Sequence, residues 1–472
     1  MVQTVEMITT VLQAQRAAFT RQPRRPLAER REDLRRLEAM VLEDMPLWAE
    51  AVSADFGHRA AMETQLLELS AVARAARSAR RELRQWMAPR PVSTPMFAAP
   101  GRSSVRHEPK GVVGVVSPWN YPIQLALMPL IAALAAGCRV MIKPSELTPR
   151  TNTMLAERLA AIFPTDQIAI IQGGPDVAEA FCAQPFDHLF YTGSTRVGRK
   201  VAQAAAENLT PLTLELGGKS PVIVDADYAL NALVHPLTWG RFLNAGQTCV
   251  APDHVLSVGD PARSRAIGEA VIRQAQTFYP DFVANPDYTA IIADSHFQRL
   301  EALVKEARAA GVAVLQAVHD PVAARQARKF PPTVLIDPPS HLRAMQEEIF
   351  GPILPVLTCA SVNAAVEQIN ARGHPLALYV FSKRRRLVAE ILDRTLSGGV
   401  TLNGTMLHLA NDNLPFGGVG ASGYGAYRGR RGFEEFSHAR SVLATGGWHS
   451  TRLAAPPYGR LSRLIMQLAV KL

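Results

Sequence analysis

Residues 111–143, GVVGVVSPWNYPIQLALMPLIAALAAGCRVMIK, decide the fold class of this chain. They begin with an apolar run of strand length, Val112–Ser117, continue with a longer apolar run, Ile123–Ala136, and end with a second short run, Arg139–Lys143. Strands that are buried on both faces read as continuous apolar runs, and parallel neighbours are joined by a helix. The stretch therefore predicts a strand, a helix and a second strand of a parallel sheet.

The same stretch is also nearly long enough to cross a membrane. A spanning helix needs about 20 consecutive apolar residues, and residues 122–142 approach that length. However, Pro129, Gly137 and Arg139 interrupt the run. We therefore expect a buried helix that leads into a buried strand, and no membrane span.

The alternation of strand-like and helix-like runs extends along the chain from this unit. Residues 1 to about 90 have apolar side chains at helical spacing, and prolines at 89, 91 and 95 end that pattern. Further strands are predicted at 168–171, 188–192, 211–215, 221–224, 289–292, 313–315, 333–335, 353–357, 378–380 and 439–444. Further helices are predicted at 152–162, 177–183, 197–206, 271–278, 297–309 and 362–371. This order indicates an α/β protein, and 472 residues predict two or three domains.

The composition excludes several classes of protein. A net charge of +10 could indicate a nucleic-acid partner, but the arginines of residues 16–36 alternate with acidic side chains, as on a solvated helix face. We expect no nucleic-acid binding. The four cysteines (Cys138, Cys182, Cys249 and Cys359) form no CxxC pair, so we expect no metal site. Few cysteines and the lack of a recognisable signal peptide favour a cytoplasmic location.

Two turns could bind a dinucleotide. Gly193-Ser194-Thr195-Arg196-Val197-Gly198 follows a predicted strand and opens a predicted helix, where backbone N–H groups and the helix dipole favour a phosphate. Lys143-Pro144-Ser145-Glu146 ends another strand, where a carboxylate can accept hydrogen bonds from ribose hydroxyls. An ordinary β-α turn and a solvated loop, respectively, would have the same residue types.

Two further residues could carry covalent chemistry. Glu215 lies between Leu214 and Leu216, where loss of water would raise its pKa and make it a general base; a buried Glu–Lys pair is the alternative. Cys249 follows the polar segment Asn244–Thr248, and a thiol there could be a nucleophile. An isolated cysteine is more often an inert core residue, and His254 is not made a base by being near in sequence.

Seven motifs in order along the chain resemble the aldehyde dehydrogenase superfamily. They are Ser117–Pro122 (SPWNYP), Lys143–Glu146 (KPSE), Gly193–Gly198 (GSTRVG), Leu214–Lys219 (LELGGK), Gly246–Cys249 (GQTC), Glu347–Pro352 (EEIFGP) and Pro415–Gly420 (PFGGVG). The resemblance implies a Rossmann-type parallel cofactor domain, an α/β catalytic domain and a small β-extension that mediates oligomerisation.

The resemblance also implies a role for each motif residue. Cys249 would attack the aldehyde carbon, the Asn120 side chain and the Cys249 N–H would hold the oxyanion, and Glu215 would activate the water that hydrolyses the thioester. The cofactor, NAD with NADP as the alternative, would contact a larger set. These residues are Trp119, Lys143, Glu146, Gly193, Ser194, Thr195, Gly198, Leu216, Glu348 and Phe350.

The same resemblance divides the chain. Residues 1–89, 111–216 and 411–434 would form the cofactor domain, residues 217–410 the catalytic domain, and residues 90–110 and 435–447 the extension of a homodimer. Residues 448–472 would form a tail with an amphipathic helix, either docked on the protein or, as the alternative, in contact with a membrane surface.

Within this superfamily, the sequence is most similar to the branch that acts on coniferyl, fatty and benzaldehyde-type aldehydes. Cys249–Asp253 (CVAPD), Gly425–Tyr427 (GAY) and Pro456–Gly459 (PPYG) carry that similarity. The expected substrate is therefore an aromatic aldehyde or a medium- or long-chain aliphatic one. Gly404 and Arg428 depart from the residues common in the family, Asp and His, in segments expected near the substrate.

Overall fold

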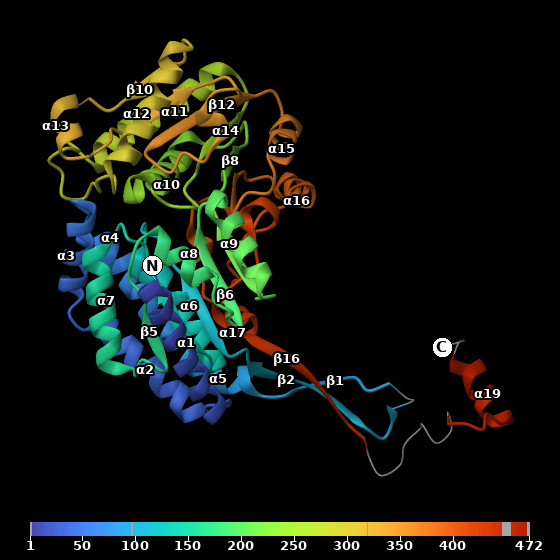
Figure 1. The fold of residues 1–472 in the computed structure, drawn as a ribbon. Coiled ribbons are helices and arrows are strands. Elements are labelled where there is room, and N and C mark those ends of the chain that lie inside the picture. The colour runs from blue at the N-terminus through green and yellow to red at the C-terminus, as the bar shows by residue number, and fades with distance from the viewer. Residues whose placement is uncertain (1, 96–97, 319, 446–454, 470–472) are drawn as a thin grey trace.

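The computed structural model describes residues 2–95, 98–318, 320–445 and 455–469. Figure 1 shows two lobes and a narrow arm of strands that projects from one of them. Positions 446–447 of the predicted extension, and 448–454 and 470–472 of the predicted tail, lie outside the described residues. None of the helices in the described part of the chain is long and apolar enough to cross a membrane.

The first 90 residues form helices, as predicted. They are α1 (Val2–Arg21), α2 (Leu27–Leu42), α3 (Met45–Phe56), α4 (Ala61–Glu63), the π-helix η1 (Thr64–Leu69) and α5 (Ser70–Met87). Helix α5 shows why, because Val72, Ala76, Ala79, Leu83 and Trp86 recur every three or four residues and all are buried. These helices pack against α6 and α7 of the first lobe.

The first lobe contains a six-stranded sheet in the order β15-β7-β6-β3-β4-β5. Its strands are β3 (Val112–Val116), β4 (Arg139–Lys143), β5 (Ile168–Ile170), β6 (His188–Gly193), β7 (Leu212–Leu216) and β15 (Gly423–Tyr424). Strands β3 to β7 are parallel, and only the late edge strand β15 is antiparallel. The helices of this lobe are α6 (Pro122–Ala136), α7 (Pro149–Ile162), α8 (Pro175–Cys182), α9 (Thr195–Glu207) and α17 (Gly429–Glu435).

The second lobe contains a seven-stranded sheet in the order β10-β11-β12-β9-β8-β13-β14. Its strands are β8 (Pro221–Val224), β9 (His254–Val258), β10 (Ala313–Gln316), β11 (Thr333–Ile336), β12 (Ile353–Cys359), β13 (Ala377–Phe381) and β14 (Gly399–Leu402). Its helices are α10 (Leu230–Phe242), α11 (Pro261–Phe278), α12 (Asp294–Ala309), α13 (Pro321–Gln326), α14 (Arg343–Gln346), α15 (Val362–Asn370) and α16 (Arg385–Arg394), with short 3₁₀ turns η3 (Leu243–Gly246) and η4 (Leu407–Ala410). A further 3₁₀ turn, η5 (Gly420–Ser422), contacts β7 and leads into β15 of the first sheet. Residues 217–220 connect the two sheets.

The arm is a three-stranded antiparallel sheet of β1 (Arg90–Val92), β2 (Arg102–Pro109) and β16 (Ser437–Ala444). Strands β2 and β16 pair along eight residues, from Ser437 opposite Pro109 to Ala444 opposite Arg102. Most side chains of β1 and β16 are exposed, so the arm buries little of itself against its own chain.

The predicted strand at 289–292 is wrong, and several elements were not predicted, among them α10, β9, α16 and β14. Residues 289–292 form a loop instead of a strand, because their backbone groups bond elsewhere: Ala290 N–H to the His58 carbonyl, and Ile292 N–H to the Gln247 side chain. Strand β9 was not predicted, although it lies between β12 and β8. His254 and Ser257 are polar yet buried within it, and they mask its apolar pattern.

The terminal helix α19 (Arg460–Ala469) lies apart from both lobes in Figure 1. Leu464 and Met466 are 52% and 63% exposed. Docking of this helix on a protein surface, and its contact with a membrane as the alternative, both stay predictions.

Candidate active site

Cys249 lies in the loop between η3 and β9, and its side chain is half-buried. The residues just before it are held in an uncommon conformation, since Asn244 and Ala245 have φ of 51° and 50°. Left-handed backbone at non-glycine residues costs free energy and concentrates at functional sites. The loop that presents this thiol is thus shaped by contacts around it and not by local preference.

The environment of Cys249 suppresses its ionisation. Burial raises the pKa of Cys249 to about 12, with further increases from the Glu348 and Glu215 carboxyl groups, while the N–H groups of Cys249 and Val250 oppose the shift. The two carboxyl groups therefore lie close enough to the thiol to act on its charge. Without a bound cationic group, this thiol stays protonated at neutral pH.

Glu215 lies near the carboxyl end of β7, opposite Gly423 of β15. Both of its carboxyl oxygens are buried and have no hydrogen-bond partner among the described residues. Burial raises the pKa of Glu215 well above its ordinary value, and the Arg428 guanidinium partly opposes this. Lys219 forms its ion pair with Asp253, so the alternative of a Glu215–Lys pair is wrong.

Asn120 is buried directly beside the cysteine loop. Its side-chain nitrogen donates to the Gln247 carbonyl oxygen at 3.1 Å, two residues before Cys249. An amide nitrogen carries two hydrogens, and this bond uses one of them. The neighbouring Tyr121 hydroxyl shares a 2.8 Å hydrogen bond with Thr248 Oγ1. The SPWNYP segment and the cysteine loop therefore hold each other in place.

The predicted phosphate turn has the expected form. Ser194 caps α9, since its Oγ accepts the Val197 N–H at 3.4 Å, and Ser194 itself is exposed. Gly198 lies against Leu216, and a methyl group at Gly198 would overlap the Leu216 side chain. Gly193, at the end of β6, lies against its neighbour Tyr191 in the same way. The glycines of the turn therefore permit close packing of strand and helix.

The second predicted cofactor turn pairs its two charged residues. Lys143 is buried, and its ammonium group donates to the Pro144 carbonyl at 2.9 Å and to Glu146 Oε2 at 3.4 Å. Burial lowers the pKa of Lys143, and Glu146 opposes the shift. The carboxylate is exposed at the end of β4, where ribose hydroxyls could reach it.

Three more of the predicted cofactor residues lie at the junction of the lobes. The Trp119 and Phe350 rings make an edge contact, with centroids 5.4 Å apart. Glu348 lies against Gly217, where any larger residue would overlap its carboxyl group. Burial raises the pKa of Glu348 to about 8, and its Oε1 has no partner within the described residues.

A cavity of about 430 Å³ opens at this junction. Thr195, Gly217 and Glu348 are among its lining residues, whereas Cys249 and Lys143 are not. Ligand pockets typically have volumes of ~300–1,000 Å³. The orphaned Glu348 oxygen, the glycines at 217 and 218 and the capped turn of α9 fit part of a dinucleotide here.

Arg428, which departs from the family pattern, lies close enough to Glu215 for its charge to affect the pKa of that carboxyl group. It is buried with φ of 90°, lies over the Phe416 ring at 5.1 Å and donates to the Leu409 carbonyl. Its charge lowers the pKa of Glu215, as stated above. Gly404 lies in the turn after β14.

Sequence reasoning missed three charged residues around the cysteine loop. Arg59, Glu63 and Glu68 are buried between the N-terminal helices and that loop. Their spacing resembles an exposed helical salt bridge, so residue type alone gives no signal. The apolar residues on either side of them, Phe56 and Leu69, are fully buried, and they were the available sign in the sequence that this segment is buried.

Comparison with known proteins places this geometry in one family. A model of the "Aldehyde dehydrogenase family" matches residues 2–442. A probable coniferyl aldehyde dehydrogenase of Pseudomonas aeruginosa is 42% identical and aligned over 99% of this chain and 98% of its own length. 4,4'-Diaponeurosporen-aldehyde dehydrogenase of Staphylococcus aureus is 38% identical (94% and 95%), as is the dimeric NADP-preferring aldehyde dehydrogenase of Rattus norvegicus (92% and 94%).

Solved structures agree with this comparison. Staphylococcus aureus AldH in a substrate-bound state has a TM-score of 0.92 at 36% identity and covers 98% of this chain and 99% of its own. A Mycobacterium tuberculosis aldehyde dehydrogenase complexed with NAD⁺ has a TM-score of 0.83 at 27% identity, with 94% and 91% covered.

Proposed function

Because the chain belongs to the aldehyde dehydrogenase family, whose members oxidise aldehydes with NAD or NADP, we propose that Cys249, Asn120 and Glu215 carry out this oxidation. Cys249 attacks the aldehyde carbon and forms a thiohemiacetal. The Asn120 amide and the Cys249 backbone N–H donate to the oxyanion, and removal of one such donor typically costs ~3–4 kcal/mol of transition-state stabilisation. A dinucleotide held by the residues named below would supply the acceptor for the hydride that leaves the thiohemiacetal carbon, and the acyl group would then remain on Cys249 as a thioester.

Glu215 then decides the product. It takes a proton from the water that hydrolyses the Cys249 thioester, so that the free carboxylic acid is released. The observation that carries this proposal is a buried carboxyl group with a raised pKa and two unpartnered oxygens near the thiol. A raised pKa makes the ionised carboxylate a stronger base, which is the property that a general base needs.

The proposed substrate is an aromatic aldehyde such as coniferyl aldehyde. The support is the 42% identity, over nearly the full chain, to a relative named for that activity. A long-chain aldehyde is the second candidate, favoured by the relative named for 4,4'-diaponeurosporen-aldehyde.

The proposed cofactor contacts divide into three groups. Glu348, Phe350 and Leu216 contact the nicotinamide end, Trp119 and the turn of Gly193, Ser194, Thr195 and Gly198 contact the pyrophosphate, and Lys143 and Glu146 contact the adenosine ribose. Since an exposed Glu146 carboxylate repels a 2′-phosphate, we expect NAD to be preferred over NADP.

The proposal extends to the assembly and its location. The arm of β1, β2 and β16 exposes Leu443 and Val92, and small sheets need an apolar surface to pack against. We propose that a second copy covers the arm, giving a homodimer. The domain limits given above remain the proposed ones. The described cysteines are all free, which is consistent with a cytoplasmic location.

The test is direct. Purified protein with NAD or NADP and a panel of aromatic and aliphatic aldehydes should produce reduced cofactor and carboxylic acid, with the highest kcat/KM for coniferyl aldehyde. The Cys249→Ala variant should produce neither. The roles proposed for these residues are contradicted if Cys249→Ala retains turnover. The substrate proposal is contradicted if a long-chain aliphatic aldehyde has a higher kcat/KM than coniferyl aldehyde.

A further inference from the structure

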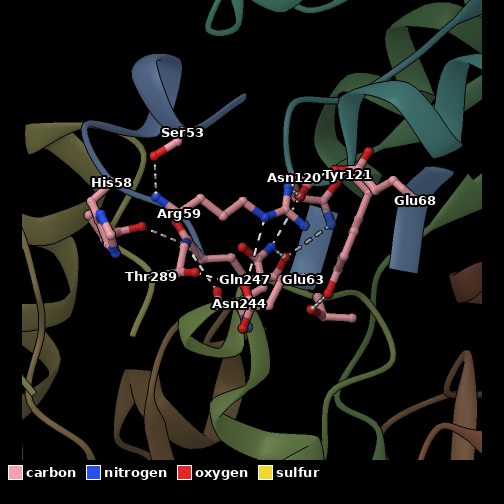
Figure 2. A network of polar contacts seen from close by, with 12 residues as sticks. Ser53, His58, Arg59, Glu63, Glu68, Asn120, Tyr121, Asn244, Gln247 and Thr289 are labelled. Carbon is pink, nitrogen blue, oxygen red and sulfur yellow. Dashed lines mark hydrogen bonds and ion pairs between the residues drawn. The ribbon is translucent and has the colours of Figure 1, made fainter. Parts of the chain in front are cut away.

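Arg59 is fully buried between the N-terminal helices and the cysteine loop (Figure 2). Its guanidinium lies 2.8 Å from Glu68 Oε1 and 3.8 Å from Glu63 Oε2. It also lies over the Phe56 and Tyr121 rings, 5.1 and 4.8 Å from their centroids. Burial of charged side chains costs free energy of desolvation, and apolar side chains of similar volume would avoid that cost. The three residues therefore suggest a role other than packing.

The π-helix η1 explains how both glutamates face one arginine. In an α-helix, residues five positions apart point about 140° away from each other. Between Thr64 and Leu69 the helix follows the wider i→i+5 pattern, which turns Glu68 toward the side of Glu63. π-Helical turns are rare and frequently occur at functional sites.

Glu68 neutralises Arg59 and holds the first lobe. Its Oε1 accepts from Arg59, and its Oε2 accepts the N–H groups of Ile123 and Gln124 at 2.8 and 3.0 Å, in the first turn of α6. Glu63 is therefore not needed as the close ion partner of Arg59.

The oxygens of Glu63 face the second lobe instead. Oε1 accepts the Asn244 N–H at 2.9 Å, and Oε2 accepts the Thr289 hydroxyl at 2.7 Å. Asn244 is one of the two left-handed residues that shape the cysteine loop. Glu63 thus stabilises the uncommon backbone that presents Cys249.

Arg59 contacts the other side of the same site. Its Nη1 donates to the Asn120 carbonyl at 3.2 Å, and the Asn244 side-chain nitrogen donates to the same oxygen at 3.1 Å. Asn120 in turn donates to the Gln247 carbonyl. One connected network therefore holds the Asn120 side chain together with Asn244 and Gln247, which precede Cys249 in its loop (Figure 2).

We propose that Glu63 and Arg59 are positioning residues, which fix the Asn120 amide relative to the Cys249 loop. The inference rests on the proposed function, because it assigns these residues to the step in which Cys249 attacks the aldehyde. A displacement of about 1 Å in a reacting group can lower a rate by about 100-fold. Neither residue touches the substrate.

Two substitutions at position 63 separate positioning from charge balance. Glu63→Leu removes both acceptors. Glu63→Gln retains an acceptor for the Asn244 N–H and can donate to Thr289 Oγ1, while it loses the negative charge. Asp33→Leu is the matched control, because Asp33 is also a buried carboxylate of the N-terminal helices, paired with Arg25 and Gln167 near the edge strand β5.

The readouts are single-turnover formation of reduced cofactor, KM for NAD and the midpoint of thermal unfolding. We expect Glu63→Leu to lower the single-turnover rate by about 100-fold, with KM for NAD close to wild type. Glu63→Gln should restore most of the rate. Asp33→Leu should lower the unfolding midpoint but not the rate. Thr289→Val, which removes one partner of Glu63, should lower the rate in the same direction by less.

The inference is overturned if Glu63→Leu is no slower than Asp33→Leu, or if Glu63→Gln is as slow as Glu63→Leu. If Glu63→Leu does not fold, an unchanged rate in Thr289→Val overturns it instead. Failure of the proposed function would look different, since wild-type protein would then oxidise no aldehyde at all.

Discussion

Glu215 and Cys249 both have a raised pKa, and the two shifts affect different steps. For Glu215, the base is the ionised form, so hydrolysis slows as the pH falls through its raised pKa. For Cys249, the nucleophile is the thiolate, which burial and two carboxyl groups suppress in the free enzyme. Steady-state and first-turnover measurements should therefore separate the two residues.

Glu215→Gln should retain the first burst of reduced cofactor and lose later turnover. General-base catalysis contributes about 10²–10⁴-fold, so steady-state turnover should fall within that range. The measurement is stopped-flow absorbance followed by steady-state rates from pH 6 to 9, against wild type. Wild-type turnover should decline toward low pH. Loss of the burst in the variant would contradict a role confined to hydrolysis.

Cys249 in the enzyme without cofactor should react with iodoacetamide ever faster from pH 7 to pH 10. An ordinary cysteine, with a pKa of about 8.5, would approach a plateau within that range, whereas a thiol with a pKa of about 12 would not. Peptide mass spectrometry locates the label, and Cys249→Ala supplies the background. A plateau below pH 9 would show that the free enzyme already stabilises the thiolate.

At this scale, the sequence indicated the site residues that belong to motifs and missed those that do not. Asn120 and Glu348 were predicted through the resemblance of their motifs, SPWNYP and EEIFGP, to the aldehyde dehydrogenase family. Arg59 and Glu63 have the spacing of an ordinary surface ion pair, and their partners lie 61 and 181 residues away. Only the fold brings such partners together.

The connection between the sheets, residues 217–220, is the element on which the cofactor cavity depends. Gly217 has to be small because the Glu348 carboxyl group occupies the position of its missing side chain. Gly218, by contrast, has space, since a methyl group there would make ordinary contacts at 3.6 Å or more. Two adjacent glycines therefore have different roles.

Gly217→Ala should displace Glu348 and raise KM for NAD, while Gly218→Ala should leave it close to wild type. The loss of one charged hydrogen-bonding contact corresponds to about 1.5–3 kcal/mol, or roughly 10- to 100-fold in affinity. The check is a pair of NAD titrations by fluorescence, with thermal unfolding as the control for folding. Equal effects of the two substitutions would contradict the proposed role of Glu348.

Strands β3 to β7 of the first sheet were predictable because they are mostly apolar and almost entirely buried. Strand β9 was not, because two of its five residues, His254 and Ser257, are polar although they are buried. The prediction of a strand at 289–292 was wrong although this run is apolar. Its backbone bonds to His58, Gln247 and Arg328 replace a strand ladder, and nothing local in the sequence reveals such distant partners.

On the scale of the whole molecule, the arm is the part least supported by its own chain. Leu443 of β16 is 52% exposed and Val92 of β1 is 38% exposed, at the end that projects furthest from the lobes (Figure 1). In the proposed homodimer these side chains are covered by the second copy.

Leu443→Glu should therefore shift the protein from dimer to monomer, because a charge would be buried without a partner. Light scattering coupled to size exclusion measures the mass at several concentrations. Ala444→Glu, at the adjacent exposed position on the opposite face of the same strand, serves as the matched control. A Leu443→Glu protein that remains a dimer would contradict the proposed interface.

The network of Arg59, Glu63 and Glu68 has a consequence for the order in which the chain acquires its structure. Glu63 leaves the ribosome 181 residues before Asn244 and 226 before Thr289. At a synthesis rate of about 5–20 residues per second, the interval between the synthesis of Glu63 and that of Asn244 is on the order of 10–40 seconds. During that interval the carboxyl group of Glu63 lacks its partners Asn244 and Thr289, which have not yet been synthesised. The contacts by which Glu63 holds the left-handed backbone before Cys249 can therefore form only after residues 244 and 289 have been synthesised.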